Sequence, residues 1–161
     1  KDNITTRILK SLALTPLAPN CSITVVMGTT APWIEYVKEQ AETMPWDIDV
    51  KVGVNNMAEL MANSDIAIGA AGATSWERCC LGLPTIMVVV AENQQTVANN
   101  LRESGAALFV NLNDISVFSM SKMIESLIEL KDQVSFNAAN VTSGVGAEFL
   151  VKNILGSSHV R

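Results

Sequence analysis

The sequence predicts one α/β domain built on a doubly wound parallel sheet of the Rossmann-like type. Five short apolar runs alternate with stretches of helical spacing, the order typical of strands joined by crossover helices. One run, PTIMVVV at residues 84–90, contains no charged residue, as expected for a strand covered by helices on both faces. A chain of 161 residues suits one hydrophobic core and leaves little for a second. We therefore expect residues 1–161 to form a single domain.

The sequence pattern of the first half of the chain predicts a helix, then two strand–helix units, then a third strand. Ile4, Ile8 and Leu12 share one face of a helical pattern at residues 3–15. The elements expected after it are a strand at 22–28, a helix at 32–44 with Pro32 in its first turn, a strand at 48–54, a short helix at 56–64 and a strand at 65–70.

The second half continues the alternation. Gly82 and Gly105 stand where helices are expected to end. In order, we expect a helix at 74–82, a strand at 84–90, a helix at 94–105, a strand at 106–111, a long amphipathic helix at 115–131, and one or two helices within 137–155, interrupted near 143–146.

Composition excludes several classes of partner. The net charge is −5 and no block of Lys or Arg is present, which argues against a nucleic-acid ligand. No apolar run approaches the ~20 residues that span a bilayer. The three cysteines lack paired metal-ligand spacing, which favours a reducing, cytoplasmic setting without a metal site. Because the chain begins with Lys1, we expect it to be a piece of a longer protein or a processed product.

The stretch GAAGATSWE, residues 69–77, lies between an expected strand and an expected helix. Gly72 and the small residues around it would let a ligand approach the backbone, and Thr74 and Ser75 would open a helix whose free N–H groups favour an anion. The alternative is a plain helix start, since Thr74 and Glu77 have the spacing of a capping box. Two familiar motifs do not fit: a P-loop requires a Lys, and the glycine pattern of a dinucleotide fold is incomplete. We expect no cofactor.

Residues 65–107, DIAIGAAGATSWERCCLGLPTIMVVVAENQQTVANNLRESGAA, carry a family resemblance. They contain D-x-x-I-x-x-x-G-x-[ST]-x-x-E, then G-L-P, an N-Q pair and a closing E-x-G-A. This string resembles the C-terminal nucleotide-binding domain of GT-B sugar-nucleotide enzymes of the MurG type. It looks still more like the PseG type of UDP-2,4-diacetamido-2,4,6-trideoxy-β-L-altropyranose hydrolase, which acts in pseudaminic acid synthesis, and like proteins of spore coat polysaccharide biosynthesis.

The resemblance implies a set of UDP-binding residues. The pyrophosphate would lie on the glycine-rich turn and helix start, and Glu77 would accept hydrogen bonds from the ribose hydroxyls. Backbone groups just before the helix expected at 56–64 would form hydrogen bonds with the uracil edge. The N-Q pair would face the sugar or the phosphate, and Gln95 is the alternative if the register shifts by one. The implied residues are Val54, Asn55, Gly72, Ala73, Thr74, Ser75, Glu77, Asn93 and Gln94. Many relatives have two glycines where this chain has Gly72-Ala73, which leaves room for a phosphate. With the resemblance counted, the phosphate site is preferred to the plain cap.

The same resemblance implies a divided active site. In the PseG family the catalytic base is a His of the N-terminal domain, whereas the one His of this chain is His159, near its end. We therefore expect the isolated chain to bind UDP or a UDP-sugar weakly, to turn nothing over, and to need its missing N-terminal domain as partner. The alternatives are a MurG-like glycosyltransferase domain, or a non-catalytic domain fused to a nonulosonic acid cytidylyltransferase. Whether Arg78 turns toward the ligand is open.

Overall fold

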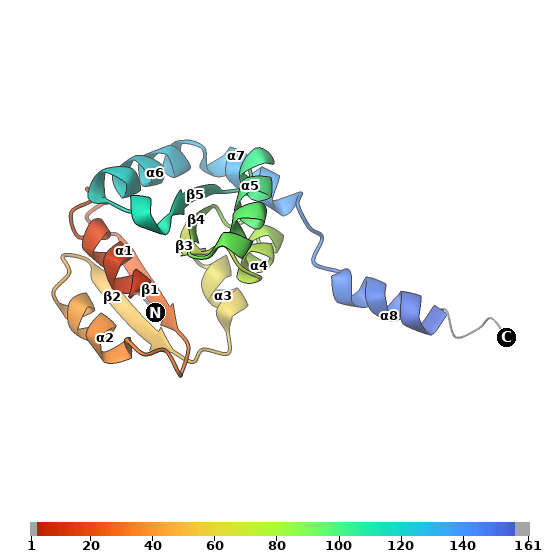
Figure 1. The fold of residues 1–161 in the computed structure, drawn as a ribbon, viewed down its shortest axis with the longest axis horizontal. Coiled ribbons are helices and arrows are strands. Elements are labelled where there is room, and N and C mark those ends of the chain that lie inside the picture. Colours follow the sequence, from red (N-terminus) through yellow and green to blue (C-terminus); the bar gives the residue numbers. More distant parts are fainter. Residues whose placement is uncertain (1–2, 157–161) are drawn as a thin grey trace.

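The computed structural model describes residues 3–156, in which parallel strands alternate with helices as the sequence predicts (Figure 1). The elements are α1 (Ile4–Leu12), β1 (Ser22–Met27), α2 (Ile34–Glu42), β2 (Asp47–Val52), α3 (Met57–Ala62), β3 (Ala67–Ala70), α4 (Thr74–Cys80), β4 (Thr85–Val89), η1 (Glu92–Gln94), α5 (Gln95–Glu103), β5 (Leu108–Asn111), η2 (Leu112–Asp114), α6 (Val117–Glu129), α7 (Lys131–Ala139) and α8 (Gly146–Gly156).

The strands form two hydrogen-bonded groups, β1-β2 and β3-β4-β5, and every pairing in them is parallel. The prediction of a parallel α/β sheet is therefore confirmed, although within residues 3–156 no ladder joins the two groups. Side chains link them instead: Ile23 of β1 and Met44 pack against the core of both groups. The carboxyl ends of β3, β4 and β5 meet at one edge, so the loops that follow these strands lie together.

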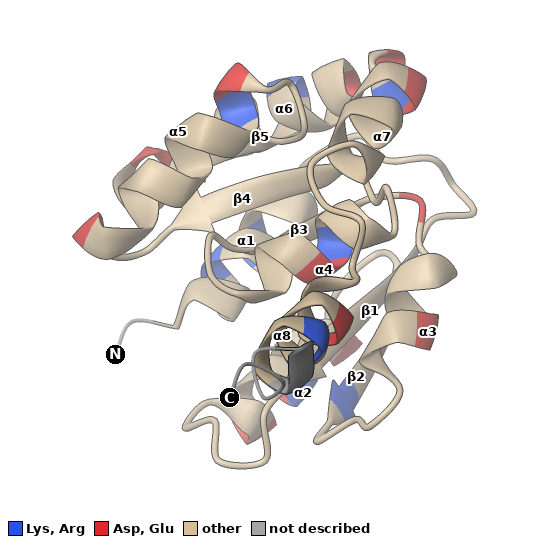
Figure 2. Cartoon of the chain, turned by 90° about the vertical axis from the view of Figure 1, so that its right-hand side faces the viewer, with Lys and Arg blue, Asp and Glu red and all other residues tan. Residues whose placement is uncertain are grey.

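The central strand β4 shows why both faces of the sheet are covered. Ile86 and Val88 belong to a core cluster with α6, whereas Met87 and Val89 belong to a cluster with α4, α5 and α7. Alternate residues of a strand point to opposite faces, so a strand between two helical layers must be apolar throughout. Every residue of β4 is buried, and β3, β4 and β5 carry no charged residue, whereas charged residues lie on β2, on helices and on connections (Figure 2).

Helix ends show one agreement and one correction. Gly82 and Gly105 have φ of +59° and +67°, the left-handed conformation expected where α4 and α5 end. The placement of Pro32 in the first turn of a helix was wrong, because α2 begins at Ile34 with Trp33 before it. Pro32 lies just outside the helix.

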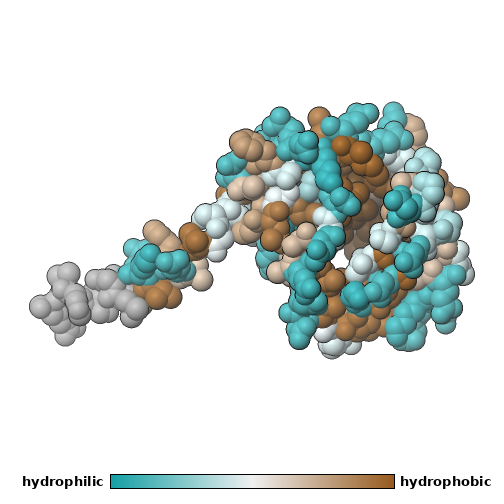
Figure 3. Space-filling model, turned by 180° about the vertical axis from the view of Figure 1, so that it is seen from behind, coloured by the Kyte–Doolittle hydropathy of each residue, from teal (hydrophilic) through white to brown (hydrophobic). Residues whose placement is uncertain are grey.

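The helix α8 extends away from the rest of the chain (Figure 1). Its residues Phe149, Leu150, Val151 and Ile154 are exposed, and Figure 3 shows hydrophobic and hydrophilic residues side by side on it. In the stretch from residue 3 to residue 156, no helix is both long and apolar enough to cross a membrane.

Candidate functional site

The loop between β3 and α4 holds the glycine-rich stretch at the carboxyl edge of the sheet. It is anchored at Ala71, which is buried and whose N–H donates to the carbonyl of Val88 in β4 at 3.2 Å. The loop then turns outward: Gly72 is half-buried, Ala73 is exposed, and a Cβ placed on Gly72 would meet no atom within 4 Å. The edge of the sheet is therefore open to a ligand at Gly72.

Three successive backbone N–H groups, those of Gly72, Ala73 and Thr74, have no acceptor in the part of the chain that the structure describes. The next two are satisfied, since Ser75 N donates to the Gly72 carbonyl at 2.9 Å and Trp76 N to the Ala73 carbonyl at 3.1 Å. Free N–H groups at the start of a helix are donors for an anion and carry its partial positive charge. The arrangement suits a phosphate group.

The capping box that the sequence allowed does not form. Thr74 is the first residue of α4 rather than its cap, the preceding Ala73 is already in the right-handed helical region, and no side chain caps the helix. The carboxylate of Glu77 has no hydrogen-bond or ion-pair partner among residues 3–156 and is exposed one turn into the helix. Both Glu77 and the Thr74 hydroxyl are thus available to a ligand.

Ser75 does not offer its hydroxyl to the open side of the loop. Its side chain is 2% exposed, donates to the sulfur of Met87 at 3.7 Å and accepts from Nη2 of Arg78 at 3.0 Å. The same Nη2 donates to the Ala70 carbonyl at 2.9 Å. Arg78 therefore turns inward, beneath the loop, and sequence reasoning had left its direction open.

The following loop, after β4, brings the N-Q pair to the neighbouring position on the same edge. Asn93 is exposed and its side chain has no hydrogen-bond partner within residues 3–156. Gln94 is half-buried, and its Oε1 accepts from the Val90 N–H at 3.1 Å. Gln95 points elsewhere, donating to Asn99 at 3.2 Å. Of the three amides, Asn93 is the one whose oxygen and nitrogen are both unused.

The residues expected to meet a base lie at the other group of strands. Val54 is half-buried and Asn55 exposed, directly after β2 and before α3. No described hydrogen bond ties them to the loop after β3. Gly28, directly after β1, also has open space beside it, since an added Cβ would meet nothing within 4 Å.

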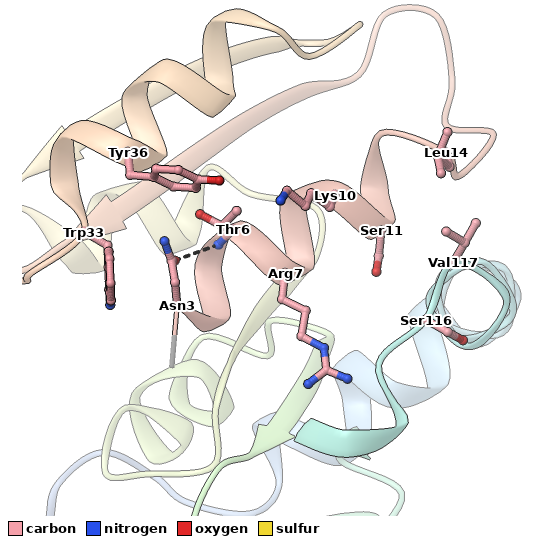
Figure 4. Close-up of a pocket in the computed structure, with 10 residues that line it drawn as sticks. All are labelled: Asn3, Thr6, Arg7, Lys10, Ser11, Leu14, Trp33, Tyr36, Ser116 and Val117. Carbon is pink, nitrogen blue, oxygen red and sulfur yellow. Dashed lines mark hydrogen bonds between the residues drawn. The ribbon is translucent and has the colours of Figure 1, made fainter. Parts of the chain in front are cut away.

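Two surface pockets lie apart from most of these residues. The first, between α1, α2 and the start of α6, contains Arg7, Lys10, Trp33 and Tyr36, and none of the predicted site residues lines it (Figure 4). In Figure 4 the Lys10 ammonium and the Tyr36 hydroxyl point toward one another across it. The second, between α4, α5 and α7, is lined in part by Trp76, a residue that is 42% exposed.

Comparison with known proteins gives this fold a family. Residues 3–153 match the model of the glycosyltransferase family 28 C-terminal domain. The chain is 30% identical over 127 residues to the spore coat polysaccharide biosynthesis protein SpsG of Bacillus subtilis, an alignment of 74% of this chain and 37% of SpsG. It is 30% identical over 105 residues to a UDP-N-acetylglucosamine–N-acetylmuramyl-(pentapeptide) pyrophosphoryl-undecaprenol N-acetylglucosamine transferase of Lactococcus lactis, over 62% of this chain and 29% of the transferase.

Solved structures show the same architecture. Acinetobacter baumannii MurG superposes with a TM-score of 0.73 at 18% identity, over 94% of this chain and 48% of MurG. The Streptomyces glycosyltransferase SsfS6, complexed with thymidine diphosphate, gives a TM-score of 0.51 at 15% identity, over 80% of this chain and 38% of that protein.

The parallel α/β fold is that of the C-terminal domains of MurG and other GT-B glycosyltransferases. The chain belongs to the glycosyltransferase family 28 C-terminal domain family. It spans about a third of the length of the curated relatives that it matches.

Proposed function

We propose that this domain binds the UDP moiety of a UDP-sugar at the carboxyl edge of its sheet. The observation that carries the proposal is the set of three unpaired N–H groups at Gly72, Ala73 and Thr74, beside open space. A diphosphate supplies the acceptors that these donors lack, and its charge is favoured at the start of α4. Because the Ser75 hydroxyl is engaged inside the protein, the cradle consists of backbone donors and the Thr74 hydroxyl.

The other groups are assigned by their place around the cradle. Glu77 lies one turn into α4 with an unengaged carboxylate, which can accept from two vicinal ribose hydroxyls at once. Val54 and Asn55 follow β2 and would offer backbone groups to the uracil edge. Asn93, and the amide nitrogen of Gln94, would face the phosphate or sugar from the loop after β4.

For the whole protein we propose a UDP-sugar hydrolase of surface polysaccharide biosynthesis, with the PseG-type substrate UDP-2,4-diacetamido-2,4,6-trideoxy-altrose. The W-E-R-C pattern and the N-Q pair support the hydrolase, and the similarity to SpsG, a spore coat polysaccharide biosynthesis protein, supports the pathway class. Another part of the protein would supply the base that activates water, since residues 3–156 contain no His; His159 lies outside the described residues. The departing UDP would keep its charge on the cradle.

A glycosyltransferase is the second candidate, favoured by the match to the Lactococcus transferase. The two reactions differ only in whether water or a sugar or lipid acceptor attacks the anomeric carbon. A non-catalytic domain fused to a nonulosonic acid cytidylyltransferase is the third. Product analysis of the full-length protein separates the first two: free sugar plus UDP indicates the hydrolase, and UDP formed only with an acceptor indicates the transferase.

The binding proposal is tested by titrating UDP into this chain and into Glu77→Ala, with CMP and NAD as competing nucleotides. Glu125→Ala is the matched control, because Glu125 is an exposed glutamate on α6, away from the loop. We expect UDP to bind the parent and the control alike and Glu77→Ala to bind about tenfold more weakly, which corresponds to ~1.4 kcal/mol. Equal affinity of the folded Glu77→Ala chain would remove the ribose role, and the absence of any UDP binding at millimolar concentration would refute the site.

A further inference from the structure

The guanidinium of Arg78 is buried behind the loop from β3 to the first residue of α4, residues 71–74, which we call the cradle loop. The residue is 7% exposed, and its Nη2 donates both to the Ala70 carbonyl, at 2.9 Å, and to the Ser75 hydroxyl, at 3.0 Å. Ala70 ends β3 and Ser75 lies in the first turn of α4. The guanidinium of Arg78 is therefore hydrogen-bonded to both ends of the loop that carries the free N–H groups.

A glycine in β3 leaves space for the guanidinium of Arg78. A Cβ placed on Gly69 would lie 2.6 Å from Nη1 of Arg78, a distance that non-bonded atoms do not occupy. Gly69 has no positive φ, so its backbone conformation does not require glycine. The need for a glycine at this position comes from the guanidinium packed against the strand.

No carboxylate forms an ion pair with Arg78 within the described chain. The Nε of Arg78 is buried without a hydrogen-bond partner there. Burial lowers the pKa of the guanidinium, an effect that the neighbouring Cys79 and Glu77 partly offset. Buried arginines are usually paired, because an uncompensated charge in the interior is costly. A bound anion on the other side of the loop would supply the missing charge.

We infer that Arg78 is the positioning residue of the cradle and the source of its preference for a diphosphate over less charged ligands. It fixes Ala70 and Ser75 so that the N–H groups between them stay directed at the ligand, and its charge attracts phosphate through the thin loop. This inference rests on the proposed function, because it assigns the UDP phosphates to the same loop. Arg78 itself does not touch the ligand.

The test compares ligands of increasing charge. The affinities of uridine, UMP, UDP and inorganic pyrophosphate are measured for the parent chain, Arg78→Met and Arg78→Lys. Arg102→Met is the control that changes the net charge equally, since Arg102 lies in the last turn of α5 over the Phe109 ring. We expect Arg78→Met to weaken UDP by about tenfold or more, UMP by about threefold and uridine by less than about twofold, because the lost attraction grows with ligand charge. Arg78→Lys should recover part of the UDP affinity, and Arg102→Met should match the parent.

The outcomes distinguish the role of Arg78 from the proposal that the loop binds UDP. Equal weakening of all four ligands by a folded Arg78→Met chain would show a purely structural role and overturn the inference, as would unchanged affinities. If Arg78→Met does not fold, Arg78→Lys decides: we expect weaker UDP with uridine unchanged, and parent-like UDP affinity overturns the role of Arg78. A parent chain that binds pyrophosphate but not UDP refutes the nucleotide proposal alone. A parent chain that binds neither refutes both.

Discussion

Replacing Gly69 with Ala adds one methyl group at the point where the structure leaves no room for it. The new Cβ would lie 2.6 Å from Nη1 of Arg78, whereas non-bonded carbon and nitrogen atoms normally rest about 3.5 Å apart. The guanidinium would have to retreat by about 1 Å. The hydrogen bonds of Nη2, at 2.9 and 3.0 Å, would then exceed the usual limit of about 3.2 Å.

The size of the effect follows from those two bonds. Hydrogen bonds to a charged group contribute about 1.5–3 kcal/mol each, and a displaced arginine recovers part of this from water. We expect Gly69→Ala to lower the free energy of unfolding by about 2–3 kcal/mol, equivalent to a fall in Tm of about 4–12 °C for a domain of this size. Denaturant and thermal unfolding followed by circular dichroism measure both quantities.

Gly72→Ala is the matched control for this experiment. It makes the same substitution three residues on, in the same loop, where the new Cβ meets nothing within 4 Å and φ is not positive. Its stability should stay within about 0.5 kcal/mol of the parent. Equal stability of the two variants would refute the reasoning, because the predicted difference depends on Arg78 lying against Gly69.

Three further predictions concern the start of α6 and the adjacent cysteines Cys79 and Cys80. The Ser116 hydroxyl accepts a hydrogen bond from the Ser119 N–H at 3.1 Å in a reciprocal capping box, so Ser116→Ala should lower the free energy of unfolding by about 1 kcal/mol, as measured by thermal unfolding. The control is Ser126→Ala, at an exposed position of the same helix, which should leave stability almost unchanged. Similar losses of stability in the two variants would contradict the role of the cap. Cys79 is 3% exposed whereas Cys80 is exposed, so iodoacetamide should alkylate Cys80 before Cys79. Peptide mass spectrometry measures the two rates. Equal labelling of the two cysteines would show that α4 opens readily. Burial raises the pKa of the Cys79 thiol; the unfolded chain therefore loses this proton first, and the stability that the thiol contributes should fall as pH rises above about 9.

The described residues carry groups suited to binding, and under our proposal another part of the protein supplies the catalytic base. Residues 3–156 contain donors for a phosphate and an unengaged carboxylate, but no His. The matched relatives are about three times as long as the aligned region.

The sequence by itself determined the alternation of strands and helices through β5 and the position of the glycine-rich stretch between β3 and α4. The uninterrupted PTIMVVV run predicted a strand covered on both faces, and Gly82 and Gly105 predicted two helix ends, because these are local consequences of side-chain polarity and backbone freedom. The glycine-rich stretch was placed at the carboxyl edge for the same reason.

Tertiary structure alone decided how side chains in that stretch divide between core and solvent. Thr74 and Glu77 have the spacing of a capping box, yet α4 begins one residue earlier than that box requires, because the loop is anchored at Ala71 to Val88 of the next strand. The same anchoring turns Ser75 inward and leaves Gly72 open. The direction of Arg78 depends on Gly69, nine residues away, and on a strand contact that no local pattern encodes.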